Sequence, residues 1–93
     1  MKARLKFEKA LLQLDRGREG DGATSLREAI ASAEAEDDGV TLVRSLVCLG
    51  ELLSSTNQFD ASNLLNRAIQ IEIEPDLLAW EKARAIEILS LLK

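Results

Sequence analysis

The sequence predicts an all-α fold of about five helices, arranged as stacked antiparallel helical hairpins. Three observations support this prediction. Apolar residues recur at three- and four-residue spacings in five successive segments, which is the periodicity of amphipathic helices. The chain is rich in Ala, Leu, Glu, Arg and Lys, and its single proline and few β-branched residues argue against a sheet. Finally, the sequence is similar to itself when it is shifted by 39 residues.

The first helix is expected over about residues 3–15, and a second over about residues 23–36. Three glycines within residues 17–22 predict the break between them, because glycine loses much conformational entropy inside a helix. Asp21 is the expected N-cap of the second helix. The apolar stripe of that helix is mainly alanine, which predicts a close approach to a neighbouring helix.

The central helix is expected over about residues 40–54, and it is the segment around which the other helices are organised. It carries apolar residues on most of its sides, and a helix of this kind is covered by neighbours on most sides. Asp38 is expected to cap its N-terminus, where a negative charge suits the helix dipole. Asn57 is expected to end it in the left-handed conformation.

Two further helices are expected after the central one. The fourth covers about residues 61–72, with Asp60 as its N-cap. The fifth covers about residues 76–92, with Pro75 at its first turn, where proline is well tolerated. The fifth helix carries more apolar residues than a single stripe requires.

The shift of 39 residues aligns the first two helices with the third and fourth. Leu14 then meets Leu53, and Leu26 meets Leu65. Periods in this range are typical of helical-hairpin arrays, in which each hairpin needs neighbours to bury its apolar face. We therefore expect one domain over residues 1–93, with repeat one at about 3–36, repeat two at about 40–73 and a closing helix at about 76–92.

Residues 46–71, LVCLGELLSSTNQFDASNLLNRAIQI, resemble a tetratricopeptide repeat, and residues 64–71 resemble the longer repeats of kinesin light chains. The family pattern has Leu-Gly in its first helix, an aromatic residue at the turn, and a small residue and an Ala-hydrophobic pair in its second helix. This chain supplies Leu49-Gly50, Phe59, Ala61 and Ala68-Ile69. Repeat one departs from the pattern, with Ala10-Leu11 in place of Leu-Gly and Gly20 in place of the aromatic residue. The resemblance implies a right-handed superhelix whose first helices line a groove for an extended or helical peptide.

The resemblance also implies which side chains line that groove, when its positions are transferred one by one. The expected peptide-binding residues are Leu5, Glu8, Lys9, Leu12 and Arg16 in repeat one, Arg44, Val47 and Glu51 in repeat two, and Arg84 in the closing helix. The alternative is that these side chains are only the less buried face of each first helix.

Catalysis is not expected, because the chain lacks the residues that usually perform it. There is no histidine, and Cys48 lies inside an apolar helix, where a packing role is expected. The glycines of residues 17–22 follow a helix and lack the Lys-Ser/Thr ending of a phosphate-binding loop. Residues 36–39 lack the spaced ligands of a calcium loop. We expect no enzyme activity, metal, cofactor or small-molecule substrate.

The charge is distributed unevenly along the chain and bears on the class of partner. The net charge is −4, with an excess of basic residues through Arg18 and an excess of acidic residues after it. The basic end is either a solvated face or a surface for an acidic partner or for the acidic end of another copy. Nucleic acid is not expected, since no aromatic residues alternate with the basic ones. No apolar run reaches about 18 residues and no signal peptide is visible, so we expect no membrane association and a cytoplasmic location.

These observations predict a non-enzymatic protein–protein interaction module that binds a peptide or protein segment in the groove. A first alternative is a homodimerisation or scaffold module, because a terminal helix without a polar outer face requires a cover. Its expected dimer face on the closing helix consists of Trp80, Ile88, Leu89 and Leu92. A second alternative is an inhibitory partner, of the immunity-protein or antitoxin type, for a basic protein.

Overall fold

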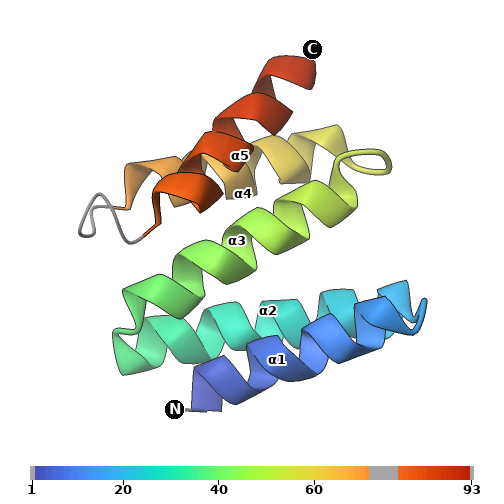
Figure 1. Ribbon diagram of the computed structural model, residues 1–93, viewed down its shortest axis with the longest axis vertical. Coiled ribbons are helices and arrows are strands. Elements are labelled where there is room, and N and C mark those ends of the chain that lie inside the picture. The colour runs from blue at the N-terminus through green and yellow to red at the C-terminus, as the bar shows by residue number, and fades with distance from the viewer. Residues whose placement is uncertain (1, 72–77, 93) are drawn as a thin grey trace.

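The described part of the chain is entirely helical, as predicted. The computed structural model describes residues 2–71 and 78–92, which contain five α-helices and no strand. The helices are α1 (Lys2–Asp15), α2 (Glu19–Glu36), α3 (Gly39–Leu53), α4 (Gln58–Gln70) and α5 (Ala79–Leu91). Figure 1 shows them following one another as a zigzag, with α1 and α2 at one end and α4 and α5 at the other. None of the described helices has the length and apolar character needed to span a membrane.

The central helix of the fold is α3, as the sequence predicted. Each helix packs on the next one in sequence, and α3 in addition contacts both α1 and α5. Since α3 touches all four other helices, it also supplies a large share of the core. Its fully buried side chains include Val43, Leu46 and Leu49, and they pack with Leu26 of α2 and Leu65 of α4.

The predicted start of the second helix was wrong, because α2 begins at Glu19. Arg18 holds the N-cap position without a side-chain hydrogen bond, so Asp21 lies in the first turn and is not the cap. Of the three glycines in residues 17–22, only Gly17, at φ +77°, has the left-handed backbone that favours glycine. Gly22 lies inside the helix and against α1. A methyl group on its Cα would be 2.5 Å from Leu14 Cδ2, so only glycine fits this close contact without a shift of Leu14. A packing contact therefore offsets the entropic cost of that glycine.

The caps around α4 also differ from the prediction. The Asn57 side chain accepts a hydrogen bond from the backbone N–H of Asp60, at 3.2 Å, so Asn57 is the N-cap and α4 begins at Gln58. Asn57 has an extended φ of −146° and does not end α3 in the left-handed conformation. That conformation occurs instead at Asp37, after α2. The expected role of Pro75 lies outside the described residues.

The predicted cap of α3 is confirmed. The Asp38 side chain accepts a hydrogen bond from the backbone N–H of Thr41, at 3.1 Å. The interactions with the Thr41 side chain and backbone lower the pKa of Asp38 below its ordinary value of 3.8, and partial burial opposes that shift. The carboxylate is therefore bound more favourably in the folded state than its protonated form.

We expect Asp38→Asn to make folding less sensitive to acid than it is in the wild type. The folded-state pKa of Asp38 is depressed, so its contribution is fully present above pH 3.8 and is lost as the pH falls through the folded-state pKa. Asparagine keeps a capping oxygen but does not titrate, whereas Asp38→Ala should cost about 1 kcal/mol at neutral pH. Urea unfolding between about pH 6 and pH 2 would measure this. Equal losses of stability in the wild type and the Asn variant would contradict the prediction.

Candidate functional site

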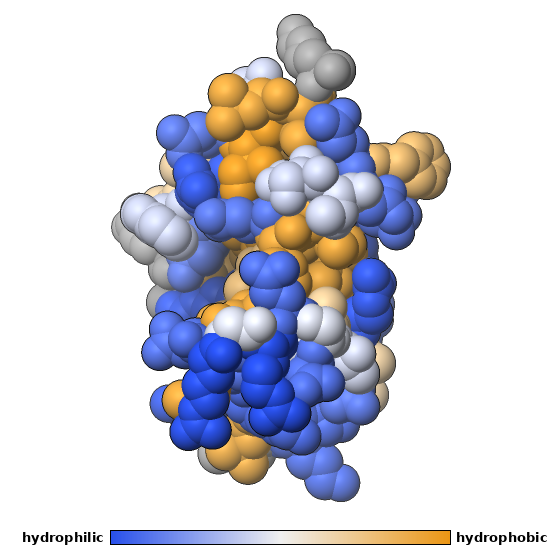
Figure 2. Space-filling view, turned by 90° about the vertical axis from the view of Figure 1, so that its right-hand side faces the viewer, coloured by the Kyte–Doolittle hydropathy of each residue, from blue (hydrophilic) through white to orange (hydrophobic). Residues whose placement is uncertain are grey.

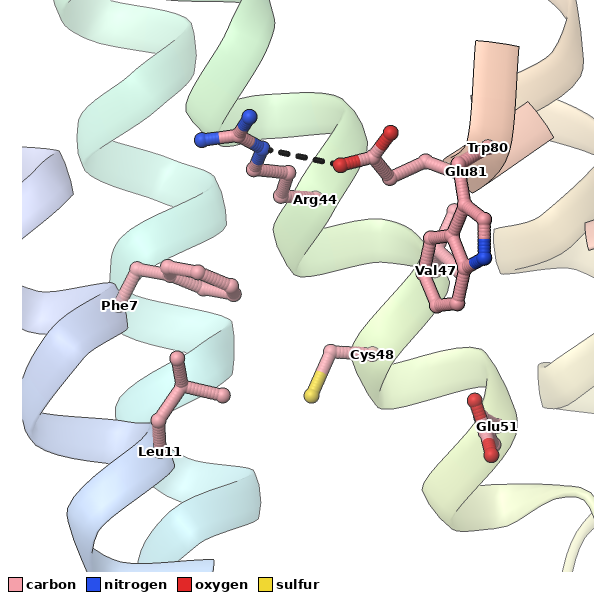
Figure 3. A pocket seen from close by; sticks show the side chains of 8 residues that line it. All are labelled: Phe7, Leu11, Arg44, Val47, Cys48, Glu51, Trp80 and Glu81. Atoms are coloured by element: carbon pink, nitrogen blue, oxygen red, sulfur yellow. Dashed lines mark hydrogen bonds and ion pairs between the residues drawn. The ribbon is translucent and has the colours of Figure 1, made fainter. Parts of the chain in front are cut away.

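A hollow of about 410 Å³ lies between α1, α3 and α5, and we call it the α1–α3–α5 groove. In Figure 3, Phe7 and Leu11 project from α1 toward α3, and Trp80 and Glu81 border the opposite side from α5. The residues that line it are Phe7, Leu11, Arg44, Val47, Cys48, Glu51, Trp80 and Glu81.

Large apolar side chains remain exposed in this groove. The Trp80 side chain has 71% of its surface exposed, and Leu11 has 42%. Val47, by contrast, is only 4% exposed and forms the floor between them. A tryptophan that is mostly in water has a large apolar area available for a further contact.

Two ion pairs at the rim connect α3 with α5. Arg44 Nε lies 3.1 Å from Glu81 Oε2, and Arg84 Nη2 lies 2.7 Å from Glu51 Oε2. Each pair is partly exposed, so each contributes little to stability. These pairs place positive and negative side chains side by side along the rim of the groove, on α3 and α5.

The chemistry of the groove does not include a reactive nucleophile. Burial, with the nearby charge of Glu51, raises the pKa of the Cys48 thiol to about 11. The thiol is therefore protonated at neutral pH, as expected for a packing cysteine. Among the described residues, no group of three or more His, Cys, Asp or Glu side chains could hold a metal ion.

The predicted groove residues on α3 and α5 are brought together. Arg44, Val47 and Glu51 line the groove, and Arg84 joins its rim through Glu51. On α1 the side chains that border this hollow are not the ones predicted to bind a peptide, whose binding role stays a prediction. Leu5, Lys9, Leu12 and Arg16 do not line the groove and are exposed elsewhere.

The α1 side chains that line the groove are Phe7 and Leu11, and Phe7 also packs against the core. Glu8 borders an adjoining hollow of about 540 Å³ between the first halves of α1 and α3. The transfer by 39 residues assumed that α1 and α3 present the same face to a ligand. Because α1 is the outermost helix at this end, only the edge that it turns toward α3 borders the groove.

The face of α5 expected to form a dimer is mostly directed inward. Ile88 is only 5% exposed, and Leu89 and Leu92 are partly buried against the core. Trp80, the fourth residue of that set, lines the groove. Besides Trp80, the large apolar side chains that α5 exposes are Ile86, at 56%, and Leu91, at 75%.

Apolar and hydrophilic residues are separated on one side of the molecule. In Figure 2 this side is hydrophilic in its lower half, where α1 and α2 lie, and shows apolar atoms in its upper half, toward the C-terminal end of α5. The exposed apolar residues of the groove and of α5 are therefore the features that a functional assignment has to explain.

The chain matches no protein-family model, no curated protein and no solved structure.

Proposed function

We propose that the chain is a non-enzymatic protein-interaction module of the tetratricopeptide type, which holds a short segment of a partner protein in the α1–α3–α5 groove. The observation that carries the proposal is the exposed Trp80 on the side of the hollow opposite the exposed Leu11, with three alternate helices lining the hollow. In a stack of hairpins, α1 and α3 are the first helices of successive repeats, and these helices line the groove in the family that the sequence resembles.

The size and lining of the groove suit an apolar side chain of a peptide. A volume of about 410 Å³ lies within the range of small binding sites in proteins. Covering Trp80 and Leu11 would remove apolar area from water, which contributes about 25 cal/mol per Å² before the costs of association. The rim pairs Arg44–Glu81 and Arg84–Glu51 could exchange partners with charges of the ligand. Shape and apolar contact would then dominate affinity, as at other interfaces.

Trp80→Ala is expected to weaken, by about tenfold or more, the binding of peptides selected from a random library on the wild-type protein. Phe59→Ala is the matched control, because Phe59 is an aromatic residue with 76% exposure that does not line the groove. Binding would be measured by fluorescence anisotropy of labelled peptides. The proposal fails if both variants bind equally well.

Two intrinsic probes show whether a selected peptide occupies the groove. Trp80 is the only tryptophan and the chain has no tyrosine, so a peptide without aromatic residues should shift its emission to shorter wavelength. Cys48 is the only cysteine, and alkylation of its thiol should slow when the groove is filled. An unchanged emission and an unchanged alkylation rate with saturating peptide would place the binding site elsewhere.

Assembly of two copies through α5 is a second candidate, and the exposed Ile86 and Leu91 favour it. A concentration-dependent mass in sedimentation that Leu91→Glu abolishes would support it. A monomer at all concentrations would exclude it. Ile88, which the sequence predicts in the dimer face, is unsuited to this test, since a charge at a buried position would disturb the fold.

A further inference from the structure

The outer face of α1 carries a second unpartnered surface, which we call the α1 outer stripe. Its residues follow one another at alternating three- and four-residue spacings, so the first four lie in one row along α1, and Arg16 follows directly after the last helical residue, Asp15. All are exposed, and the two leucines are 65% and 58% exposed. The stripe consists of Lys2, Leu5, Lys9, Leu12 and Arg16.

Among the described basic residues through Arg18, the side chains without a partner are those of this stripe. Of the six basic residues in the segment through Arg18, three are engaged elsewhere. Arg4 pairs with Glu8, Lys6 donates to Ser32 Oγ, and Arg18 pairs with Asp21. Within the described residues, the side chains of the other three cations make no hydrogen bond or ion pair, and these are Lys2, Lys9 and Arg16.

The stripe is separate from the groove and from the core contacts of α1. Ala3 and Ala10 are fully buried on the inner side of the helix, and Phe7 and Leu11 occupy the edge toward α3. Of the acids on α1 itself, Glu8 pairs with Arg4, and Asp15 lies at the end of the helix. The stripe therefore combines exposed leucines with free positive charge.

We infer that the α1 outer stripe docks an acidic amphipathic helix of a partner protein. Alternating steps of three and four residues give the 3.5-residue period at which two helices pack along a seam. Leu5 and Leu12 are seven residues apart, so they match leucines of the partner helix at the same spacing. Carboxylates between the partner's leucines would meet Lys9 and its neighbours in the stripe. The seam from Lys2 to Arg16 is about 21 Å long, which is two heptads.

Other occupants fit the stripe less well. Membrane-surface helices combine a broad apolar face, usually with aromatic residues, with cations on the opposite face, whereas here the cations alternate with two leucines in one row. A second copy of the chain would need a face that is both apolar and acidic. Among the described helices, α5 exposes Ile86 and Leu91, but its exposed acid Glu87 is already paired with Arg84.

The test uses a labelled synthetic helical peptide of three heptads, with leucine at every seventh position and glutamate at the other seam positions. A peptide of the same composition in scrambled order is its control. Fluorescence anisotropy with the full chain should show binding of the patterned peptide at least tenfold tighter than that of the scrambled one, and this binding should weaken as salt is raised.

The variant Lys9→Glu should weaken binding about tenfold, and a peptide with lysine at the facing position should restore it. Arg27→Glu is the matched control, because Arg27 is an exposed α2 cation outside the stripe with the same charge change. Trp80→Ala should leave this binding unchanged, which separates the inference from the groove. Equal binding of the scrambled peptide, or an equal effect of Arg27→Glu, would overturn it. Binding to phosphatidylserine vesicles in place of the peptide, or a dimer lost in Lys9→Glu, would also overturn it.

Discussion

Leu46→Ala is expected to lower the free energy of unfolding by about 3 kcal/mol. Leu46 is fully buried in α3, the helix that contacts all the others. The substitution removes buried apolar groups and leaves a cavity that the surrounding helices can fill only in part. A domain of this size has a total stability of only about 5–15 kcal/mol, so the variant should unfold at a clearly lower urea concentration.

The matched control for this prediction is Leu12→Ala. It makes the same chemical change at a side chain that is 58% exposed, so the stability should change by no more than about 0.5 kcal/mol. Both variants would be followed by helical circular dichroism during urea titration. A loss below about 1 kcal/mol at Leu46 would mean that α3 is not the central element of the core.

The position of α3 could be predicted because its sequence is apolar on nearly every side. Its buried residues, which include Thr41, Leu49 and Val47, are spread over more than half of the helix circumference, and no single neighbour could cover them all. The structure meets this requirement with four contacting helices. The Asp38 cap was predictable for a related reason, since its hydrogen bond to the backbone of Thr41 depends only on residues close in sequence.

Helix starts that depend on packing were not predictable from local rules. Residues 17–22 contain three glycines and were expected to form a break, but Gly22 lies inside α2 because it lets that helix approach Leu14 of α1. At the next hairpin, Asn57 and Asp60 are both good caps by residue type. The position at which the chain turns after α3 decides which of them caps α4. In the structure this residue is Asn57.

The residues that line the hollow could be predicted from the sequence on α3 but not on α1, and their role in binding stays a prediction. Arg44, Val47 and Glu51 follow from the position of α3 between two other helices, and they do line the hollow. For α1, the repeat alignment could not indicate how the outermost helix is rotated. Phe7 and Leu11 look like core residues in the sequence, since an apolar pair at this spacing is as suitable for a core as for a groove.

Gly50→Ala is expected to destabilise the protein by about 2 kcal/mol, although alanine is the better helix former by about 1 kcal/mol. A methyl group at Gly50 would lie 2.7 Å from both Cγ and Cδ2 of Leu65, which is fully buried in α4. Leu65 has no free space into which it could move, so α3 and α4 would have to separate. The cost of overpacking therefore exceeds the gain in helix propensity.

The glycines of α2 provide the comparison that isolates this contact. Gly20→Ala should raise the free energy of unfolding by about 0.5–1 kcal/mol, because nothing lies within 4 Å of the added methyl group. Gly22→Ala should fall between the two, since it meets Leu14, which is only partly buried and can move aside. Urea unfolding of the three variants would give this order. A Gly50→Ala protein as stable as Gly20→Ala would show that α3 and α4 do not approach each other closely at Gly50.

In both hairpins a glycine on one helix faces a leucine on the other, but the glycine belongs to the second helix in α1–α2 and to the first in α3–α4. The two hairpins therefore share the close approach without sharing the residue that permits it.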